Sequence, residues 1–498
     1  MTVRVVSGRL WVDWDFNGVF TDESQYLISA NGDMALSAFG AGLAGGGGMV
    51  SQANFTLRNV NGRFSPLRSD GALYSYIQAG KGYHVPVYFE VSIDGGSSYD
   101  RVFTGVLKLP SEDTLTTKEL GTVTLDARSR EEIYLQRRLS LTNAQFAAIH
   151  TGRMTEKDII STYLQLAGVS GSDMTLDPGI FVIDWAWLDD ESPIEECWAL
   201  AAAGGGRLYA DPDGEFRFES MAHWQTASRS RTSQLTLARA NGGYGSLALR
   251  YDDSNLFNVV TVEAAPRSVG AVDVIWEPET MPVVEPQSTI TLTARFDAPA
   301  YTISGIQFSA ANGGGRDMTA SVTITPTYYA QRADLQIANA SNVRVHLNPL
   351  RILGTPVVGA PEVEESRNST DHGQNAAFFA SRGTRTKAIR GNPYVQSRAH
   401  AGTMAQMLLD QCEYPRLVAT VRNAPGDPAL RLSDRVTVTD APTITGSLAL
   451  IVTRIDWSYD VKFRQTIEGV DVTQLNRYDG EYFIVGTHAA NGTARLFY

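Results

Sequence analysis

Alternating apolar and polar residues dominate the first 130 positions of the chain. The clearest run extends from Val85 to Ile93, where every second residue is apolar. This period of two is typical of a strand with one buried face. The run ends at Asp94-Gly95-Gly96, which predicts a hairpin turn because glycine tolerates the positive φ of tight turns. Several short strands of this kind predict a barrel or a sandwich over residues 1–130.

A helical period replaces the alternation over residues 131–232. Thr155 is a predicted N-cap, and the apolar residues after it share one helical face until Gly168. A second helix is predicted to begin at Ser192-Pro193, since serine caps helices and proline fits the first helical position. A hairpin follows, with its turn at Asp211-Pro-Asp-Gly214. These signals predict a small α+β module.

Alternation then returns for most of the remaining chain. Residues 266–354 combine Thr, Val and Ile alternation with turn signals, which predicts an inserted β-sandwich-like module. The flanking segments 233–265 and 355–475 are predicted to form a second β domain, which includes one helical stripe. Residues 476–498 are predicted to be a C-terminal extension. The predicted fold class is therefore mainly β, with a small α+β module between two barrel-like domains.

Composition narrows the class of protein. The chain has 498 residues, of which 43% are hydrophobic and 19% charged, so it can bury substantial cores. It carries 42 Lys and Arg against 54 Asp and Glu, a formal charge of −12. Proteins that grip nucleic acid use a net positive surface to neutralise phosphates. The acidic balance therefore argues against nucleic-acid binding as the main task.

The cysteines and the N-terminal segment predict a chain that folds in a reducing cytosol. Cys197 and Cys412 lie far apart and in no metal or redox spacing, so no disulfide framework is expected. The first 16 residues alternate and contain Asp13 and Asp15, unlike the apolar core of a signal peptide. No stretch reaches the roughly 18 uninterrupted apolar residues of a membrane span.

One segment matches a cofactor motif. Gly40-Ala-Gly42-Leu-Ala-Gly45 has the G-x-G-x-x-G spacing of a dinucleotide site, which must open a helix that receives the pyrophosphate. Here it continues into Gly46-Gly47-Gly48, which cannot begin a stable helix. We therefore interpret it as a loop and predict no cofactor. Asp211 to Glu215 similarly resembles part of a calcium loop, but it lacks the remaining ligands and is better explained as a turn.

The most enzyme-like stretch is acidic and contains two tryptophans. Its members are Asp184, Trp185, Trp187, Asp189, Asp190, Glu191, Glu195 and Glu196. Paired carboxylates beside tryptophans can act on a sugar as acid and base. However, the last acids precede or open a capped helix, where the helix dipole favours negative charge. We interpret the stretch as structural and assign no catalytic residue.

No metal site is predicted either. Seven histidines are scattered through the chain without an H-E-x-x-H motif or a pairing with cysteine, whereas zinc needs converging ligands. The basic residues near Arg382, Arg385, Lys387 and Arg390 have little aromatic interleaving, so a solvated face or a subunit contact explains them better than nucleic acid.

Three segments in order resemble tail-tip hub proteins of long-tailed bacteriophages. The first covers 53–91 and 102–110 and matches the pattern N-x-x-G-R-F/Y-S-P together with later glycine and F-x-G positions. The matching residues are Asn59, Asn61, Gly62, Arg63, Phe64, Ser65, Pro66, Gly80, Phe103 and Gly105. The second covers 193–220. The third begins at 364–389, where Ser369, Thr370, Gly373 and Arg382-Gly383 replace the usual D-S-x-S-I-x-x-Y-G-x-R, so this loop has diverged.

The resemblance implies a structural virion protein without enzymatic activity. Such hubs are homotrimers whose two tube-type β domains per subunit form a pseudo-sixfold ring, which joins the sixfold tail tube to a threefold tip. The implied partners are the distal tail or tube ring, the tape measure protein, tail fibre or tip proteins, passing DNA without specific binding, and the host surface. The implied location is the tail tip of a virion assembled in the bacterial cytoplasm. We expect the C-terminal extension to dock on a neighbour, with Phe483, Phe497 and Tyr498 as candidate contacts.

Two other functions remain open at this stage. A receptor-binding adhesin of the tail would display a binding surface, for instance on 266–354, and would bind glycan. A tail-associated hydrolase of the cell wall or of glycans would depend on acids such as Asp189 and Glu195.

Overall fold

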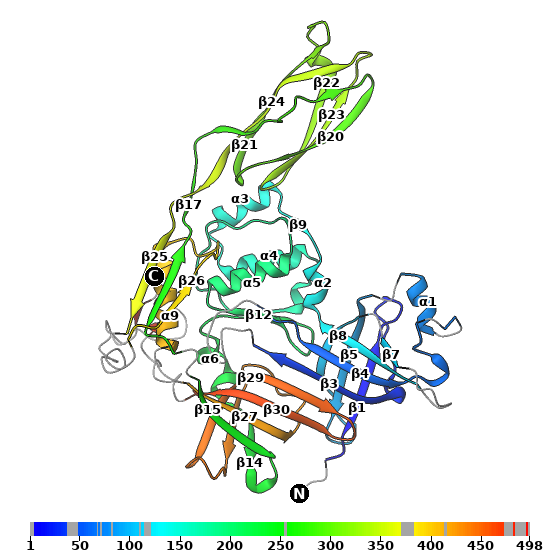
Figure 1. The fold of residues 1–498 in the computed structure, drawn as a ribbon, viewed down its shortest axis with the longest axis vertical. Helices are drawn as coiled ribbons and strands as arrows, with labels where there is room; N and C mark the ends of the chain where they lie inside the picture. Colours follow the sequence, from blue (N-terminus) through cyan, green and yellow to red (C-terminus); the bar gives the residue numbers. More distant parts are fainter. Residues whose placement is uncertain are drawn as a thin grey trace.

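The fold is mainly β with a small helical layer, as the sequence predicts (Figure 1). The computed structural model describes residues 4–36, 48–66, 68–69, 72–80, 83–108, 111–113, 121–252, 256–369, 383–412, 416–472, 482–483 and 495–496. Among the helices in these ranges, none has both the length and the hydropathy that crossing a membrane requires.

The N-terminal β region forms one half of a large sheet. Its elements are β1 (Ser7–Val12), β2 (Thr21–Asp22), β3 (Leu27–Ala35), β4 (Gln52–Arg58), α1 (Ala72–Gln78), β5 (Val85–Ser92), β6 (Asp100–Leu107), β7 (Ser111–Asp113) and β8 (Thr122–Ser129). The strands follow the order β3-β4-β8-β6-β5-β1-β2, and β7 pairs with β8. The predicted strand at Val85 is confirmed, since Val85, Val87, Phe89 and Val91 are all buried.

The second β region forms the other half of the same sheet. Its strands are β14 (Ser233–Ala238), β15 (Ser246–Asp252), β27 (Arg416–Pro425), β28 (Arg435–Thr439), β29 (Ser447–Tyr459) and β30 (Phe463–Asp471). The first residues of β29 pair with β28, and its last six pair with β3. The result is one 14-stranded sheet, which stays open within the described residues. Neither half closes into a barrel of its own within the described residues. Instead, β3 of the first half pairs with β29 of the second.

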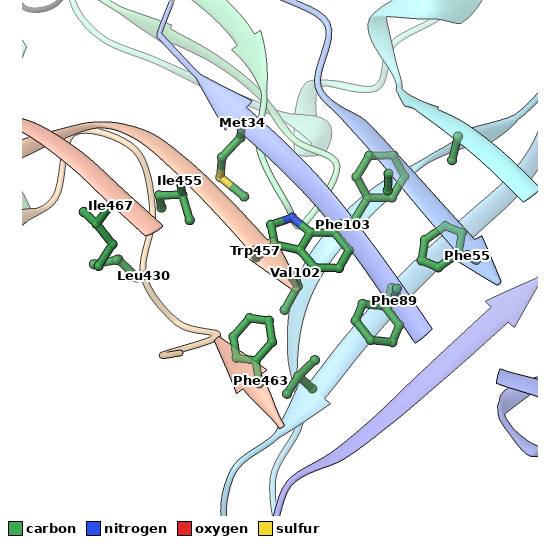
Figure 2. Packing of buried hydrophobic residues seen from close by; sticks show 14 of the residues in the cluster. Met34, Phe55, Phe89, Val102, Phe103, Leu430, Ile455, Trp457, Phe463 and Ile467 are labelled. Carbon is green, nitrogen blue, oxygen red and sulfur yellow. The ribbon is translucent and has the colours of Figure 1, made fainter. Parts of the chain in front are cut away.

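The two halves also share one hydrophobic core. Figure 2 shows Trp457 of β29 beside Phe89 of β5 and Phe463 of β30. Phe55 and Phe103 extend the same cluster into the N-terminal region. Apolar side chains from both β regions therefore stabilise a single packed unit.

The α+β layer contains short strands and capped helices. Its elements are α2 (Glu131–Leu135), β9 (Leu139–Ser140), α3 (Asn143–Gly152), α4 (Glu156–Leu166), β10 (Met174–Leu176), β11 (Asp189–Glu191), α5 (Pro193–Ala203), β12 (Arg207–Ala210), β13 (Phe216–Glu219), α6 (His223–Thr226) and α7 (Ser228–Arg231). Both predicted caps are confirmed: Thr155 forms a capping box with Asp158, and Ser192 accepts a hydrogen bond from the Glu195 amide.

A second sheet packs on the core of this layer. It comprises β16 (Val259–Ala264), β25 (Val363–Asn368) and β26 (Thr386–Ile389), and α9 (Arg398–Cys412) lies against it. Val260, Val262 and Met404 are buried in the same cluster as Ile160 of α4. Residues from both sides of the predicted boundary at 232 thus share one core. The exact domain boundaries stay a prediction.

Residues 266–354 build an arm of two sheets that projects from the α+β layer (Figure 1). One sheet contains β17 (Arg267–Val269), β18 (Asp273–Trp276), β19 (Val283–Val284), β21 (Ala300–Asn312) and β24 (Val345–Gly359). The other contains β20 (Ser288–Arg295), β22 (Val322–Tyr328) and β23 (Arg332–Asn339). The core between them includes Leu335, Ile337 and Leu347, all fully buried. The arm has the predicted β-sandwich-like character.

Of the three residues predicted as C-terminal contacts, one lies within the described residues. Phe483 belongs to β31 (Tyr482–Phe483), which pairs in parallel with β32 (Arg495–Leu496). Phe497 and Tyr498 lie outside the described residues.

Candidate functional site at a three-way junction

The turn between β12 and β13 is built around one buried carboxylate. Asp211 accepts hydrogen bonds from the amides of Asp213 at 2.9 Å and Glu215 at 3.0 Å. Its other oxygen pairs with the Arg217 guanidinium at 2.5 Å. Burial raises the pKa of Asp211, and the neighbouring arginine only partly opposes this shift. These contacts confirm that the Pro-Asp-Gly sequence forms a turn, as predicted.

This turn contacts both β regions. The Thr104 hydroxyl of β6 donates to the carbonyl of Pro212 at 2.6 Å, and Arg130 donates to the carbonyl of Gly214 at 2.6 Å. From the second β region, Arg431 forms an ion pair with Asp213 at 3.0 Å. The hairpin therefore joins three parts of the chain at one point.

A buried carboxylate next to the turn reinforces the junction. Glu219 of β13 is 3% exposed and accepts hydrogen bonds from Arg207 at 2.8 Å and Tyr209 at 2.7 Å. Ser433 of the second β region donates a third at 2.6 Å. Burial alone would raise the pKa of Glu219, but His223, Arg207 and the hydroxyl donors outweigh it and lower the pKa. The carboxylate is therefore charged and fully paired, the condition under which a buried charge is tolerated.

His223 connects Glu219 to the loop after β10. Its Nδ1 lies 2.8 Å from Asp177 and its Nε2 lies 3.5 Å from Glu219. Burial favours the neutral ring, but the two carboxylates outweigh burial and raise the pKa of His223. The imidazole is thus biased towards the charged form that both carboxylates stabilise.

A second set of contacts completes the junction on the side of the second β region. Trp224 donates its indole N–H to Ser433 at 2.9 Å. Arg229 binds both oxygens of Asp434, at 2.6 and 2.5 Å, in the two-pronged geometry that makes arginine pairs strong. A cavity of about 490 Å³ lies between these groups and residues of β3 and β6.

The chemistry of this junction is that of a structural joint. Three arginines around the cavity are each paired with a carboxylate: Arg217 with Asp211, Arg229 with Asp434 and Arg431 with Asp213. Within the part of the chain that the structure describes, no cluster of three or more His, Cys, Asp or Glu side chains is arranged to hold a metal.

The acidic stretch near residue 190 lies elsewhere, at the base of the arm. Asp189 forms an ion pair with Arg332 at 3.3 Å, and Trp187 donates its indole N–H to Gln331 at 3.0 Å. Glu196 accepts a hydrogen bond from Tyr394. Asp189, Trp187 and Glu196 therefore each bind a different partner, while burial and the neighbouring Glu196 raise the pKa of Glu191.

The arm is anchored by one of its own turns. The Ala330 amide donates to the carbonyl of Leu141 at 2.9 Å, and Asn143 donates to the carbonyl of Ala300 at 2.5 Å. Ala330 is fully buried in the core of the α+β layer, and Tyr301 contacts Trp185 edge to face at 5.7 Å. The arm is thus fixed to the layer by packing and hydrogen bonds.

The glycine-rich motif ends in a tight contact. Its residues from Gly40 to Gly47 lie outside the described residues. Gly48 forms a bridge with Leu208 of β12, and a Cβ at this position would lie 1.5 Å from Nε1 of Trp198. The last glycine of the run is therefore required by close packing.

Sequence reasoning missed the Glu219 cluster and the anchor of the arm. Glu219 and His223 are an ordinary i, i+4 pair in the sequence, and their partner Ser433 is more than 200 residues away. No local pattern distinguishes such residues from solvated ones. The one part of this junction that the sequence indicated was the Asp211 turn. Its conformation was predicted, but its contacts were not.

Comparisons with known proteins extend this description. No protein-family model and no curated protein matches the sequence. Among solved structures, a tail protein from Neisseria meningitidis MC58 matches with a TM-score of 0.48 and 10% identity, over 94% of this chain and 96% of that chain. The 43 kDa tail protein of prophage MuSo2 from Shewanella oneidensis matches with a TM-score of 0.45 and 11% identity, over 94% and 99%.

A third structure is a type VI secretion component from Escherichia coli, described as similar to tail proteins of bacteriophage T4. It matches with a TM-score of 0.36 and 9% identity, over 93% of this chain and 76% of that chain. The first two structures are described as tail proteins.

Proposed function

We propose that this chain is a structural protein of a phage tail tip, a trimeric hub that closes the tail tube and joins it to the tip. The observation that carries the proposal is the single sheet built from two β regions and locked by the junction at Glu219. A subunit that places two β units side by side, in fixed orientation, offers six units in a trimer. Six units are what a threefold component needs to match a sixfold tube.

The proposed partners are those that the resemblance to tail-tip hub proteins implies. The ring of β units contacts the distal tail or tube ring, and its channel passes the tape measure protein and then DNA. The arm, which is held away from the large sheet, is available to tail fibre or tip proteins or to the host surface. Phe483, Phe497 and Tyr498 are proposed to contact a neighbouring subunit. The proposed location is the virion tail tip after assembly in the host cytoplasm.

The proposed role is not enzymatic. Two acids of the acidic stretch are engaged in contacts with other elements: Asp189 binds Arg332 of the arm, and Glu196 binds Tyr394, which lies before α9. A catalytic acid and base need access to substrate and pKa values suited to proton transfer. Engagement of the carboxylates in contacts with other elements supports a structural role for them.

The decisive experiment is the mass and symmetry of the purified full-length chain. We expect light scattering to give a trimer and electron microscopy to give threefold particles with a central channel. Antibodies against the chain should label the tail tip of virions produced with it. A stable monomer at all concentrations, or labelling away from the tail, contradicts the proposal.

A further inference from the structure

The neck of the arm is a two-stranded ribbon, in which β17 pairs with residues 357–359 at the end of β24 (Figure 1). Next to it, the Ala360 amide donates to the carbonyl of Pro266 at 2.8 Å, so the ribbon continues into the sheet of β16 and β25. Among the described strands, β17 pairs with β24 alone, which leaves its other edge open. An open strand edge offers unpaired backbone groups to an incoming chain.

Arg267, the first residue of β17, stacks on an indole. Its Cζ lies 4.5 Å from the centroid of the Trp187 ring. The indole N–H of Trp187 is bound to Gln331, so the ring that supports the guanidinium is itself fixed. Guanidinium groups stack well on aromatic faces because they are planar and weakly hydrated. The contact therefore holds the cation in one place.

This guanidinium lacks an anion. Arg267 is partly buried, and its Nε is enclosed without a hydrogen-bond acceptor among the described residues. Burial lowers the pKa of Arg267, and the group that opposes this shift is the hydroxyl of Tyr394, which already donates to Glu196. A desolvated charge is costly unless an opposite charge and hydrogen bonds compensate it. Within the described residues, no carboxylate supplies that compensation.

Other arginines of the arm do have carboxylate partners. Arg332 pairs with Asp189 at 3.3 Å at the base of the arm, and Arg351 pairs with Glu277 at 3.0 Å on its surface. The chain thus supplies acids to guanidinium groups near the neck and beyond it. In the part of the chain that the structure describes, the guanidinium of Arg267 is left over at a position that is only partly solvated.

An open space adjoins Arg267 on the same face of the ribbon. Gly359 is paired directly with Arg267, and directly paired residues project to the same face. A Cβ at Gly359 would meet no atom of the described residues within 4 Å, so this position is vacant. Val269, two residues along β17, belongs to the same face and is 42% exposed. The neck thus combines a cation, a vacant position and an exposed apolar side chain.

We propose that the neck binds an extended segment of a partner protein, whose carboxylate side chain pairs with Arg267 in the space beside Gly359. A guanidinium presents two parallel N–H donors that fit a carboxylate. An extended segment suits the open edge of β17, to which it adds as a further strand. Val269 supplies an apolar contact next to the ion pair, which favours a peptide over a free inorganic anion. The proposal goes beyond the role of a hub, because it assigns a binding point at the base of the arm.

A fluorescent peptide and the purified full-length chain test the proposal by fluorescence polarisation. The peptide is acetyl-Thr-Val-Glu-Val-Thr with a C-terminal fluorophore, and the control peptide carries Gln in place of Glu, which keeps the shape and removes the charge. We expect the Glu peptide to bind at least about tenfold more tightly than the Gln peptide, as for hydrogen bonds between charged groups. Equal affinities, or no binding of the Glu peptide up to millimolar concentration, would overturn the proposal.

Substitutions of Arg267 show whether this residue carries the preference. Arg267→Gln should abolish the preference for the Glu peptide. Arg267→Lys should keep part of it, because lysine retains the charge but loses the two-pronged geometry of arginine. A preference that survives Arg267→Gln would contradict the assignment, since the carboxylate is then bound elsewhere.

Gly359→Val tests the vacant position without changing the guanidinium. The added side chain should fill the space and lower the affinity for the Glu peptide about tenfold, the size of an overpacked contact, while the thermal midpoint stays unchanged. Gly313→Val, in the turn after β21, is the matched control, because a Cβ there also meets no atom within 4 Å. Unaltered binding by Gly359→Val, or an equal loss in both variants, would place the peptide away from the neck.

Discussion

The indole of Trp457 on β29 stacks on the ring of Phe89 on β5, with ring centroids 5.5 Å apart and ring planes 16° from parallel (Figure 2). These residues belong to different β regions and are not on neighbouring strands. The stack therefore holds the two halves of the sheet around one core. Stacked aromatic pairs contribute beyond the area that they bury.

Replacing this indole should weaken the whole large sheet. Trp457 is 3% exposed, and truncation of a buried tryptophan to alanine costs about 3–5 kcal/mol. We expect Trp457→Ala to lower the free energy of unfolding by that amount in denaturant titrations. Val461→Ala is the control, since Val461 is 84% exposed near the same strand and should change stability little. Equal effects of the two substitutions would contradict a shared core.

The junction should make stability depend on pH through His223. Its pKa is raised in the folded chain, so its contribution is complete below about 6.5, the ordinary pKa of histidine, and is lost as the pH rises through the folded value. The charged groups that face it are Asp177, Glu219 and Arg207. We expect His223→Gln to cost about 1.5–3 kcal/mol at pH 5.5, the range for hydrogen bonds to charged groups. The difference in the free energy of unfolding between variant and wild type should shrink by pH 9. A difference that stays constant with pH would contradict the role of His223 protonation.

Glu131 should add a second pH dependence of the same sign, within the α+β layer. Burial raises the pKa of this fully buried carboxyl to about 7, against weaker opposing hydrogen bonds from Ser129 and the Ala210 amide. A raised carboxyl pKa stabilises the protonated fold, so this contribution falls as the pH rises from about 4.5 to 7. We expect Glu131→Gln to flatten the stability profile across that window. An unchanged slope would show that the carboxyl titrates normally.

Local signals explain which features could be predicted from the sequence. Helix starts at Thr155 and Ser192 depend on neighbouring residues, and both were predicted correctly. The pairing of β29 with β3 joins residues more than 400 positions apart, and alternation alone does not say which strands become neighbours. Asp189 could be judged structural from its place before a helix, but its partner Arg332 could not be identified.

Breaking the buried contact of Ala330 should disorder the anchor of the arm locally. Ala330 is fully buried and donates its amide to Leu141, so Ala330→Asp would place an unpaired charge in the core of the α+β layer. We expect amide exchange to accelerate at the turn around Ala330 and at the contacts with α3. Amides in the middle of β23 should remain protected. Thr291→Asp on the exposed arm surface is the control and should leave exchange at the anchor unchanged.

The close contact between Gly48 and Trp198 predicts that substitutions at these two residues have coupled effects on stability. A Cβ at residue 48 would lie 1.5 Å from Nε1 of Trp198, far closer than non-bonded atoms approach, so Gly48→Ala requires the indole or the backbone to move. We expect a loss of about 1–3 kcal/mol, as for overpacking in a core. Gly359→Ala is the control, because a Cβ there meets no atom within 4 Å.

Trp198→Ala should remove most of the cost of Gly48→Ala, because the obstructing ring is then absent. Residues in contact give coupling energies of about 0.5–3 kcal/mol in double-mutant cycles, whereas distant residues add independently. We therefore expect the double variant to be more stable than the sum of the single effects. Simple additivity would show that the strain at Gly48 comes from its backbone and not from the indole of Trp198.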